Sequence, residues 1–223
     1  MQKMLLDVPG TGAGFERIHV KPGPWAADLS RDSGWAYFPD DSLVGLSPSR
    51  PALGEPTIAV VGHRGFWFSG AQLQAQVLRG GHLYRLDWAL VQGNPQRYAP
   101  WLISAAEASQ RLIRQMTQMA FCANHHTPIQ CAASWLLVCL HQASKSALPI
   151  HLGDIPSALG QPGDAFQAAL GVLDAHWGIH RDADLLPLPG QDVMSARPWT
   201  LDPAQLSRLA CNCHRRINEE ASV

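Results

Sequence analysis

Residues 100–123 read PWLISAAEASQRLIRQMTQMAFCA. In this stretch apolar or small residues recur at alternating steps of three and four, at Leu102, Ala105, Ser109, Leu112, Met116, Met119 and Ala123. This spacing, held over about three heptads, predicts one long helix with an apolar seam. A seam this regular favours a partner helix, so we expect these residues to form a homodimer interface. The alternative is a helix that packs only on its own domain.

The residues before this helix have the pattern of a β-structure. Short apolar runs such as 18–20, 35–38, 43–46 and 57–61 alternate with turns rich in glycine and proline. Closely spaced short strands with such turns are typical of a sandwich or barrel. We therefore expect the N-terminal part of the chain to be all-β.

The residues after the long helix have a helical pattern. A second helix is predicted over 128–143, followed by a helix-turn-helix over 153–176. Residues 199–201 have the composition of a returning strand. Asp202 is suited to cap a last helix, with Pro203 at its first position.

The composition sets limits on the class of protein. The net charge is -1 and only 16% of the residues are charged, which gives no sign of the basic balance usual in dedicated nucleic-acid binders. The longest apolar run, residues 135–140, is far shorter than the roughly 20 residues of a membrane span, and no signal peptide is apparent. The five cysteines form no regular disulfide framework, so we expect a cytoplasmic protein.

Four segments in this order resemble the Crp/Fnr family of bacterial transcriptional regulators. The first two, residues 36–46 and 60–66, are similar to strand segments of one large branch. Residues 130–140, with Ser134-Trp135-Leu136-Leu137, and residues 206–213 are similar to two of its helices. The resemblance covers about residues 15–217. It implies an α+β chain with a jelly-roll-like N-terminal β-roll (1–97), a dimerisation helix (98–126) and a C-terminal winged helix-turn-helix-like domain (127–223).

The chain departs from this family at the effector sites. Members that bind a cyclic nucleotide carry a phosphate-binding cassette with a glycine-glutamate pair and a later arginine, and residues 62–85 contain no such cassette. No cysteine precedes Cys122, so the N-terminal cluster ligands of the oxygen-sensing branch are absent. We expect no response to cyclic AMP and no cofactor.

The segment that should read DNA also departs from the family. By the resemblance, the DNA-contacting positions are Gln161, Gly163, Asp164, Gln167, Ala168 and Arg181. Family members place arginine where this chain has Gly163 and Ala168. Residues 146–180 contain no Lys or Arg and three carboxylates, although Lys and Arg supply most of the affinity for phosphates. Pro156 is expected to bend the supporting helix.

The sequence gives little indication of a metal site or of an enzyme active site. Cys211, Cys213 and His214, taken with Cys122 and the pair His125-His126, fit no standard zinc spacing, so we expect packed or surface thiols and no metal site. No motif of an acid, base or nucleophile suggests an enzyme.

Two functions remain open. The first is a Crp/Fnr-type regulator that binds DNA as a homodimer, with Arg181, Arg197 or Lys145 holding phosphates at the edges of the unit. The second is a degenerate member that no longer binds DNA and acts as a protein-interaction or small-ligand-binding module, for example by pairing with an intact paralogue.

Overall fold

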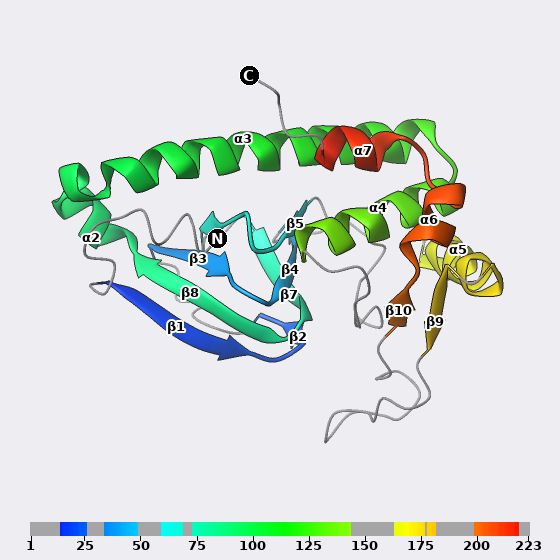
Figure 1. The fold of residues 1–223 in the computed structure, drawn as a ribbon, viewed down its shortest axis with the longest axis horizontal. Coiled ribbons are helices and arrows are strands. Elements are labelled where there is room, and N and C mark those ends of the chain that lie inside the picture. Colours follow the sequence, from blue (N-terminus) through cyan, green and yellow to red (C-terminus); the bar gives the residue numbers. More distant parts are fainter. Residues whose placement is uncertain are drawn as a thin grey trace.

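The computed structural model describes residues 14–25, 34–48, 59–68, 73–143, 163–176, 178–181 and 199–218. A β-roll and a helical C-terminal part lie side by side beneath one long helix, α3, which runs the length of the molecule (Figure 1). The predicted α+β class and the predicted order of β-roll, long helix and helical part are confirmed. None of the helices in the described ranges combines the length and apolarity that a membrane span requires.

The β-roll consists of two antiparallel four-stranded sheets. The first has the order β1-β8-β3-β6 and the second has the order β2-β7-β4-β5. The strands are β1 (Phe15–Val20), β2 (Gly23–Pro24), β3 (Trp35–Pro39), β4 (Leu43–Pro48), β5 (Ala59–Val61), β6 (Trp67–Phe68), β7 (Leu73–Arg79) and β8 (Gly81–Asp87). The glycine- and proline-rich segments keep these strands short, as the sequence predicts.

Aromatic side chains fill the interior of the roll. Tyr37 stacks on Trp67 with ring centroids 5.1 Å apart, and Trp25 packs edge-on against both rings. A second group, Phe38, Phe66 and Trp101, joins the first sheet to α3. Burial of such large rings supplies much of the apolar stabilisation of a small domain.

A short helix, α2 (Trp88–Gly93), leads into α3 (Pro95–His125), which has 31 residues. The sequence predicted that the long helix would begin at about Pro100, where the residue pattern changes and the apolar seam starts. That start was wrong: Pro95 occupies the first turn, and Pro100 lies inside the helix. The extra residues bring Tyr98 into the core beneath the first sheet, where Trp101 is also buried.

The helix α4 (Pro128–Gln142) is the centre of the C-terminal core. Thr127 caps it, since its hydroxyl accepts from the Gln130 N–H while the Gln130 side chain accepts from the Thr127 N–H. All ten residues from Cys131 to Leu140 are buried. A helix that is apolar on every side must be covered on every side, and the helices α3, α5, α6 and α7, together with β5, provide this cover.

The rest of the C-terminal part packs on α4. It comprises α5 (Gly163–Ala175), the antiparallel strands β9 (Ile179–Arg181) and β10 (Trp199–Leu201), α6 (Pro203–Leu209) and α7 (Cys213–Asn218). The predicted cap is confirmed, because Asp202 accepts from the backbone N–H groups of Ala204 and Gln205, with Pro203 in the first turn. In Figure 1 α7 lies against the end of α3, and β9 and β10 lie below α5 and α6.

Candidate DNA-reading unit and dimer helix

The helix α5 is the helix that the sequence predicted to read DNA; it packs against α4 and is followed by the two antiparallel strands of a wing, β9 and β10. Ala169, Leu170 and Leu173 are buried and anchor it. The exposed side carries Ala168, Gly171, Asp174, Ala175 and His176. Residues 163–175 contain two carboxylates and no Lys or Arg. The side chains described on this exposed side therefore offer a phosphate backbone no permanent positive charge.

The predicted DNA-contacting residues divide into two groups. Gly163 and Asp164 lie in the first turn of α5, Gln167 and Ala168 follow in the next, and Arg181 ends β9. Of these, only Ala168 has a described side chain, and it is exposed. Gln161, the supporting helix with Pro156, and the edge residues Lys145 and Arg197 lie outside the described residues.

The wing that follows α5 is short and antiparallel. Arg181 pairs with Trp199 and Ile179 pairs with Leu201, which is buried together with Ile179. This pairing fixes the backbone of Arg181 at the open end of the wing, opposite Trp199. Arg181 therefore belongs to the strand that follows α5 and not to α5 itself.

The predicted dimer seam lies at the border of the buried side of α3. Ala105 and Met119 are buried within their own chain, and Leu102, Leu112 and Met116 pack partly against the β-roll core. Ser109 and Ala123 are half-buried. Much of this seam therefore serves packing within the chain, which was the alternative that the sequence left open.

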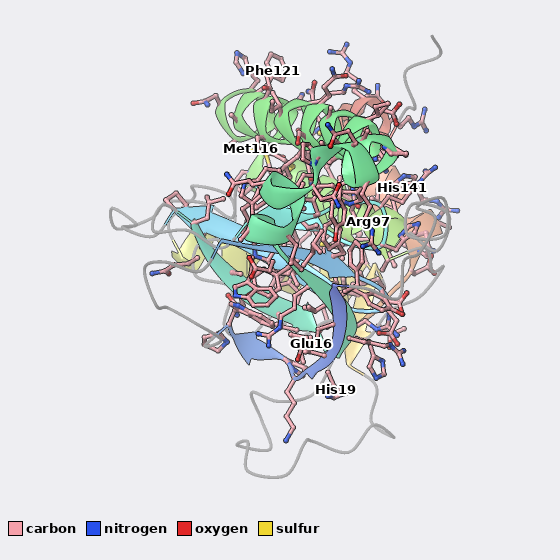
Figure 2. All side chains as sticks on the ribbon, turned by 90° about the vertical axis from the view of Figure 1, so that its left-hand side faces the viewer. Glu16, His19, Arg97, Met116, Phe121 and His141 are labelled. Atoms are coloured by element: carbon pink, nitrogen blue, oxygen red, sulfur yellow. The ribbon has the colours of Figure 1, made fainter. Side chains whose placement is uncertain are left out.

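A second apolar stripe on α3 faces outward. Ile103 is 66% exposed, Ile113 is 62% exposed and Phe121 is 44% exposed, and Ala106 and Ala120 lie between them on the same side of the helix. Phe121 projects from the side of α3 that is turned away from the β-roll (Figure 2). This stripe was not predicted from the sequence, because the half-buried side of the helix carries apolar residues as well.

Two glutamines of α3 make contacts within the chain, Gln115 and Gln118. Gln115 is only 2% exposed, and with its amide suitably oriented it donates to the carbonyl of Val60 and accepts from its N–H, both at 3.0 Å. Because β5 is the edge of its sheet, this one side chain satisfies backbone groups that would otherwise be unpaired. The side-chain amide of Gln118 donates to the Sγ atom of Cys213.

The place of an effector cassette is short. Only residues 69–72 separate β6 from β7, and the neighbouring interior of the roll is occupied by Tyr37 and Trp67, which are almost fully buried. In sequence these four residues are Ser-Gly-Ala-Gln, which carry no charge for a phosphate.

Comparisons with known proteins agree on one architecture. No protein-family model and no curated protein matches the chain. Among solved structures, a transcriptional regulator of the Crp/Fnr family from Eubacterium rectale is 13% identical, with 93% of this chain and 92% of that chain covered and a TM-score of 0.58. FixK2 from Bradyrhizobium japonicum is also 13% identical, with 89% and 94% covered and a TM-score of 0.57. The c-di-GMP-responsive global regulator CLP from Xanthomonas campestris is 13% identical, with 85% of this chain and 95% of that chain covered and a TM-score of 0.56.

The chain has a Crp/Fnr-like fold. At these identities the likeness is one of fold. Because the matches cover both the β-roll and the helical part, the chain has its structural elements in the same order as these regulators.

Two of the segments that resemble Crp/Fnr regulators meet in space. The turn after β5 docks on the end of α4, where the backbone N–H of His63 donates to the Gln142 carbonyl at 3.2 Å and its Nδ1 donates to the same oxygen at 2.7 Å. Gly62 lies so close to Gln142 that an added Cβ would overlap its carbonyl oxygen. These contacts hold the β-roll of this Crp/Fnr-like fold to the C-terminal core.

The joint between the β-roll and α4, formed by the contact of Gly62 and His63 with Gln142, should be destabilised by acid. Burial of the His63 ring lowers its pKa below the ordinary value, despite the hydrogen bond to Gln142, which acts in the opposite direction. The unfolded chain therefore binds a proton more readily than the folded chain below about pH 6.5. The stability that this group contributes is present above that pH and is lost as the pH falls through the folded-state pKa.

We expect His63→Gln to flatten this dependence, because glutamine can donate to the Gln142 carbonyl but does not titrate. The measurement is the free energy of unfolding in urea between about pH 5 and 8. The buried ring of His214, whose pKa is also lowered by burial, should leave part of the slope in the variant. If the free energy of unfolding changes with pH equally in the variant and the wild type, the pKa of His63 does not differ between the folded and unfolded chains.

Proposed function

We propose that this protein is a Crp/Fnr-type transcriptional regulator that binds DNA as a homodimer through its C-terminal domain. The observation that carries the proposal is the fold match, which spans both the β-roll and the helical part in regulators of this kind. The proposal divides the chain into an N-terminal domain (1–97), a dimerisation helix (98–126) and a DNA-binding domain (127–223), although the strands of the β-roll end at Asp87 and α3 already begins at Pro95. Two reading units related by a dimer axis would meet successive major grooves, about 34 Å apart.

The dimer surface of this proposal includes the outward stripe of α3. Ile103, Ile113 and Phe121 are large apolar side chains exposed on one side of the helix, and contiguous exposed apolar patches mark interaction sites. The half-buried seam residues Leu102, Ser109 and Met116 border this stripe. A second copy of α3, packed across a two-fold axis, would cover both sets with matching apolar side chains.

Contact with DNA then depends on residues that flank α5. Arg181 at the end of β9 and Arg197 beyond it are the nearest basic residues in sequence after α5, and the N-terminal N–H groups of the helix can bind a phosphate without any side chain. Gln161 and Gln167 remain as side chains that can reach base edges. Such a complex makes few ionic contacts, so its affinity should fall only gently with salt.

We expect Arg181→Ala to weaken binding to specific and non-specific DNA alike. Loss of one phosphate contact per protomer reduces the slope of log K against log salt by about 1 per protomer, or about 2 for the dimer. Fluorescence anisotropy with a labelled fragment from upstream of the gene measures this slope. Arg208→Ala, a change at an exposed residue on α6, is the matched control and should leave the slope unchanged. Equal slopes for Arg181→Ala and the wild type would exclude Arg181 as a phosphate contact.

A second candidate function is favoured by the exposed side of α5. Ala168, Gly171 and Asp174 provide no basic contact, and residues 146–180 contain no Lys or Arg at all. A dimer that had lost DNA reading would act through protein contacts, for instance by pairing with an intact paralogue. Absence of any DNA complex at low salt would select this function over the first.

Cyclic AMP is not the expected effector. Residues 69–72, which connect β6 to β7, include no charged residue, and the described interior of the roll is filled with aromatic side chains and not with a cationic cradle for a cyclic phosphate. We expect isothermal titration calorimetry with cyclic AMP to detect no binding at micromolar concentrations. A dissociation constant in the micromolar range would contradict this expectation.

A further inference from the structure

Four metal-binding side chains from two distant parts of the sequence converge at the junction of α3 with the C-terminal segment. They are Cys122 and His126 at the end of α3, and Cys211 and Cys213 between α6 and α7. Their ligand atoms all lie within 4.8 Å of one another. The three cysteines are buried and His126 is half-buried, so the cluster is closed to solvent on most sides.

The distances suit a single tetrahedral ion. The Sγ atoms of Cys122 and Cys211 are 3.5 Å apart, and Cys213 Sγ is 3.5 Å from His126 Nδ1. With Zn–S bonds of about 2.3 Å, the corners of a tetrahedron lie about 3.8 Å apart. Only small side-chain movements would therefore bring all four atoms to bonding distance of one central ion.

Polar side chains around the cluster are aimed at the sulfur atoms. The Gln118 amide Nε2 donates to Cys213 Sγ at 3.1 Å. The Ser134 hydroxyl donates to the Cys211 carbonyl at 3.2 Å and lies 3.0 Å from Cys211 Sγ. A neutral thiol is a weak acceptor, whereas a metal-bound thiolate is a strong one, so a donor such as Gln118 is typical of the outer shell of a metal site. This independent feature distinguishes the cluster from cysteines that merely pack in a core.

We propose that Cys122, His126, Cys211 and Cys213 form a structural Zn²⁺ site that clasps the end of α3 to the α6–α7 segment. Three thiolates and one imidazole are a closed structural donor set for zinc, with no position left for a substrate. Each cysteine releases its proton to solvent as its sulfur binds the ion, and His126 binds through a neutral ring nitrogen. The proposal holds whether or not the protein binds DNA.

The spacing in sequence concealed this site. Cys122 lies in the last turn of α3 and His126 is the residue that ends it, but the other pair follows only after a long interval in the sequence. Cys131 also lies near, 3.4 Å from Cys122 Sγ, but it hydrogen-bonds the backbone carbonyls of Cys122 and His126 and does not belong to the ligand set.

The test is metal content and cobalt binding of the full-length chain. The protein is purified under reducing conditions from zinc-supplemented medium, any affinity tag is removed, and zinc per chain is measured by plasma mass spectrometry. We expect one zinc per chain. The metal-free chain titrated with Co²⁺ should show the visible absorption of tetrahedral cobalt bound to thiolates.

Variants assign the ligands. His126→Ala should lower the Co²⁺ affinity by more than about a hundredfold, since even outer-shell changes cost 10- to 100-fold, and Cys213→Ser should abolish the thiolate spectrum. The neighbouring His125→Ala is the matched control, because His125 is exposed and bonds only within its own helix turn in the described contacts. Cys139→Ala is the thiol control; complete burial raises the pKa of Cys139, and the residue lies outside the cluster.

Because His126 is partly exposed, its variant should fold even if a cysteine variant does not, and circular dichroism verifies this. Zinc-free wild-type protein under these conditions would overturn the proposal, as would stoichiometric binding that survives both His126→Ala and Cys213→Ser. Equal loss of binding in His125→Ala and His126→Ala would overturn the ligand assignment.

Discussion

Replacing Ile113 with glutamate is expected to convert the dimer into a folded monomer. Ile113 is 62% exposed on the outward stripe of α3, so a carboxylate there costs the monomer little. In a symmetric dimer each substitution occurs twice, and the two carboxylates would be buried near the axis without partners. Burying unpaired charge costs several kcal/mol, so the dissociation constant should rise at least about a thousandfold, or about 4 kcal/mol.

Light scattering coupled to gel filtration at micromolar concentration measures the outcome. Leu90→Glu is the matched control, because Leu90 is 46% exposed on α2, away from the stripe, and its variant should remain dimeric. Circular dichroism should show unchanged helix content in both variants. A wild-type protein that is monomeric at this concentration, or an Ile113→Glu variant that stays dimeric, would exclude the outward stripe as the dimer surface.

The second large effect concerns the joint between the β-roll and α4. Alanine at Gly62 would place its Cβ against backbone atoms of Gln142, which lie 2.6 Å away in the case of the carbonyl carbon. Backbone atoms cannot rotate away as a side-chain end can, so either the turn or the end of α4 must move. That movement also breaks the two hydrogen bonds from His63 to Gln142. We expect a loss of about 3 kcal/mol or more in the free energy of unfolding.

Gly93→Ala provides the control for this substitution. Gly93 ends α2, and an added Cβ there meets no atom within 4 Å. Its variant should be neutral or more stable by up to about 1 kcal/mol, because alanine restricts the unfolded chain. Urea unfolding followed by tryptophan fluorescence compares the two. Equal stabilities for Gly62→Ala and Gly93→Ala would mean that the turn adjusts freely and that the joint is not close-packed.

The sequence predicted those features that depend on neighbouring residues. The strands, the extent of α4 and the cap at Asp202 followed by Pro203 rest on local turn and capping preferences, and these are confirmed. The start of α3 was wrong because proline is acceptable at more than one place in a long helix, and Pro95 competes with Pro100 for the first turn.

Features that depend on tertiary contacts could not be predicted in the same way. Gln115 reads as a surface residue in sequence, and only the exposed backbone of the edge strand β5 explains its burial. The convergence of Cys122 with Cys211 likewise requires the path of the chain around α4. The outward stripe of α3 was missed because the half-buried side of a helix and its outward side both contain apolar residues, and composition alone does not tell them apart.

The central claim is that a Crp/Fnr-type dimer binds DNA although its reading helix carries no basic side chain. The most direct measurement is fluorescence anisotropy of the wild-type dimer with the upstream fragment of its own gene and with a scrambled fragment, at about 50 and 200 mM salt. We predict a complex specific for the upstream fragment, whose affinity falls less between the two salts than the 10³- to 10⁵-fold seen with six to ten phosphate contacts. No complex with either fragment at the lower salt, where even weak electrostatic binding is detectable, would contradict the claim.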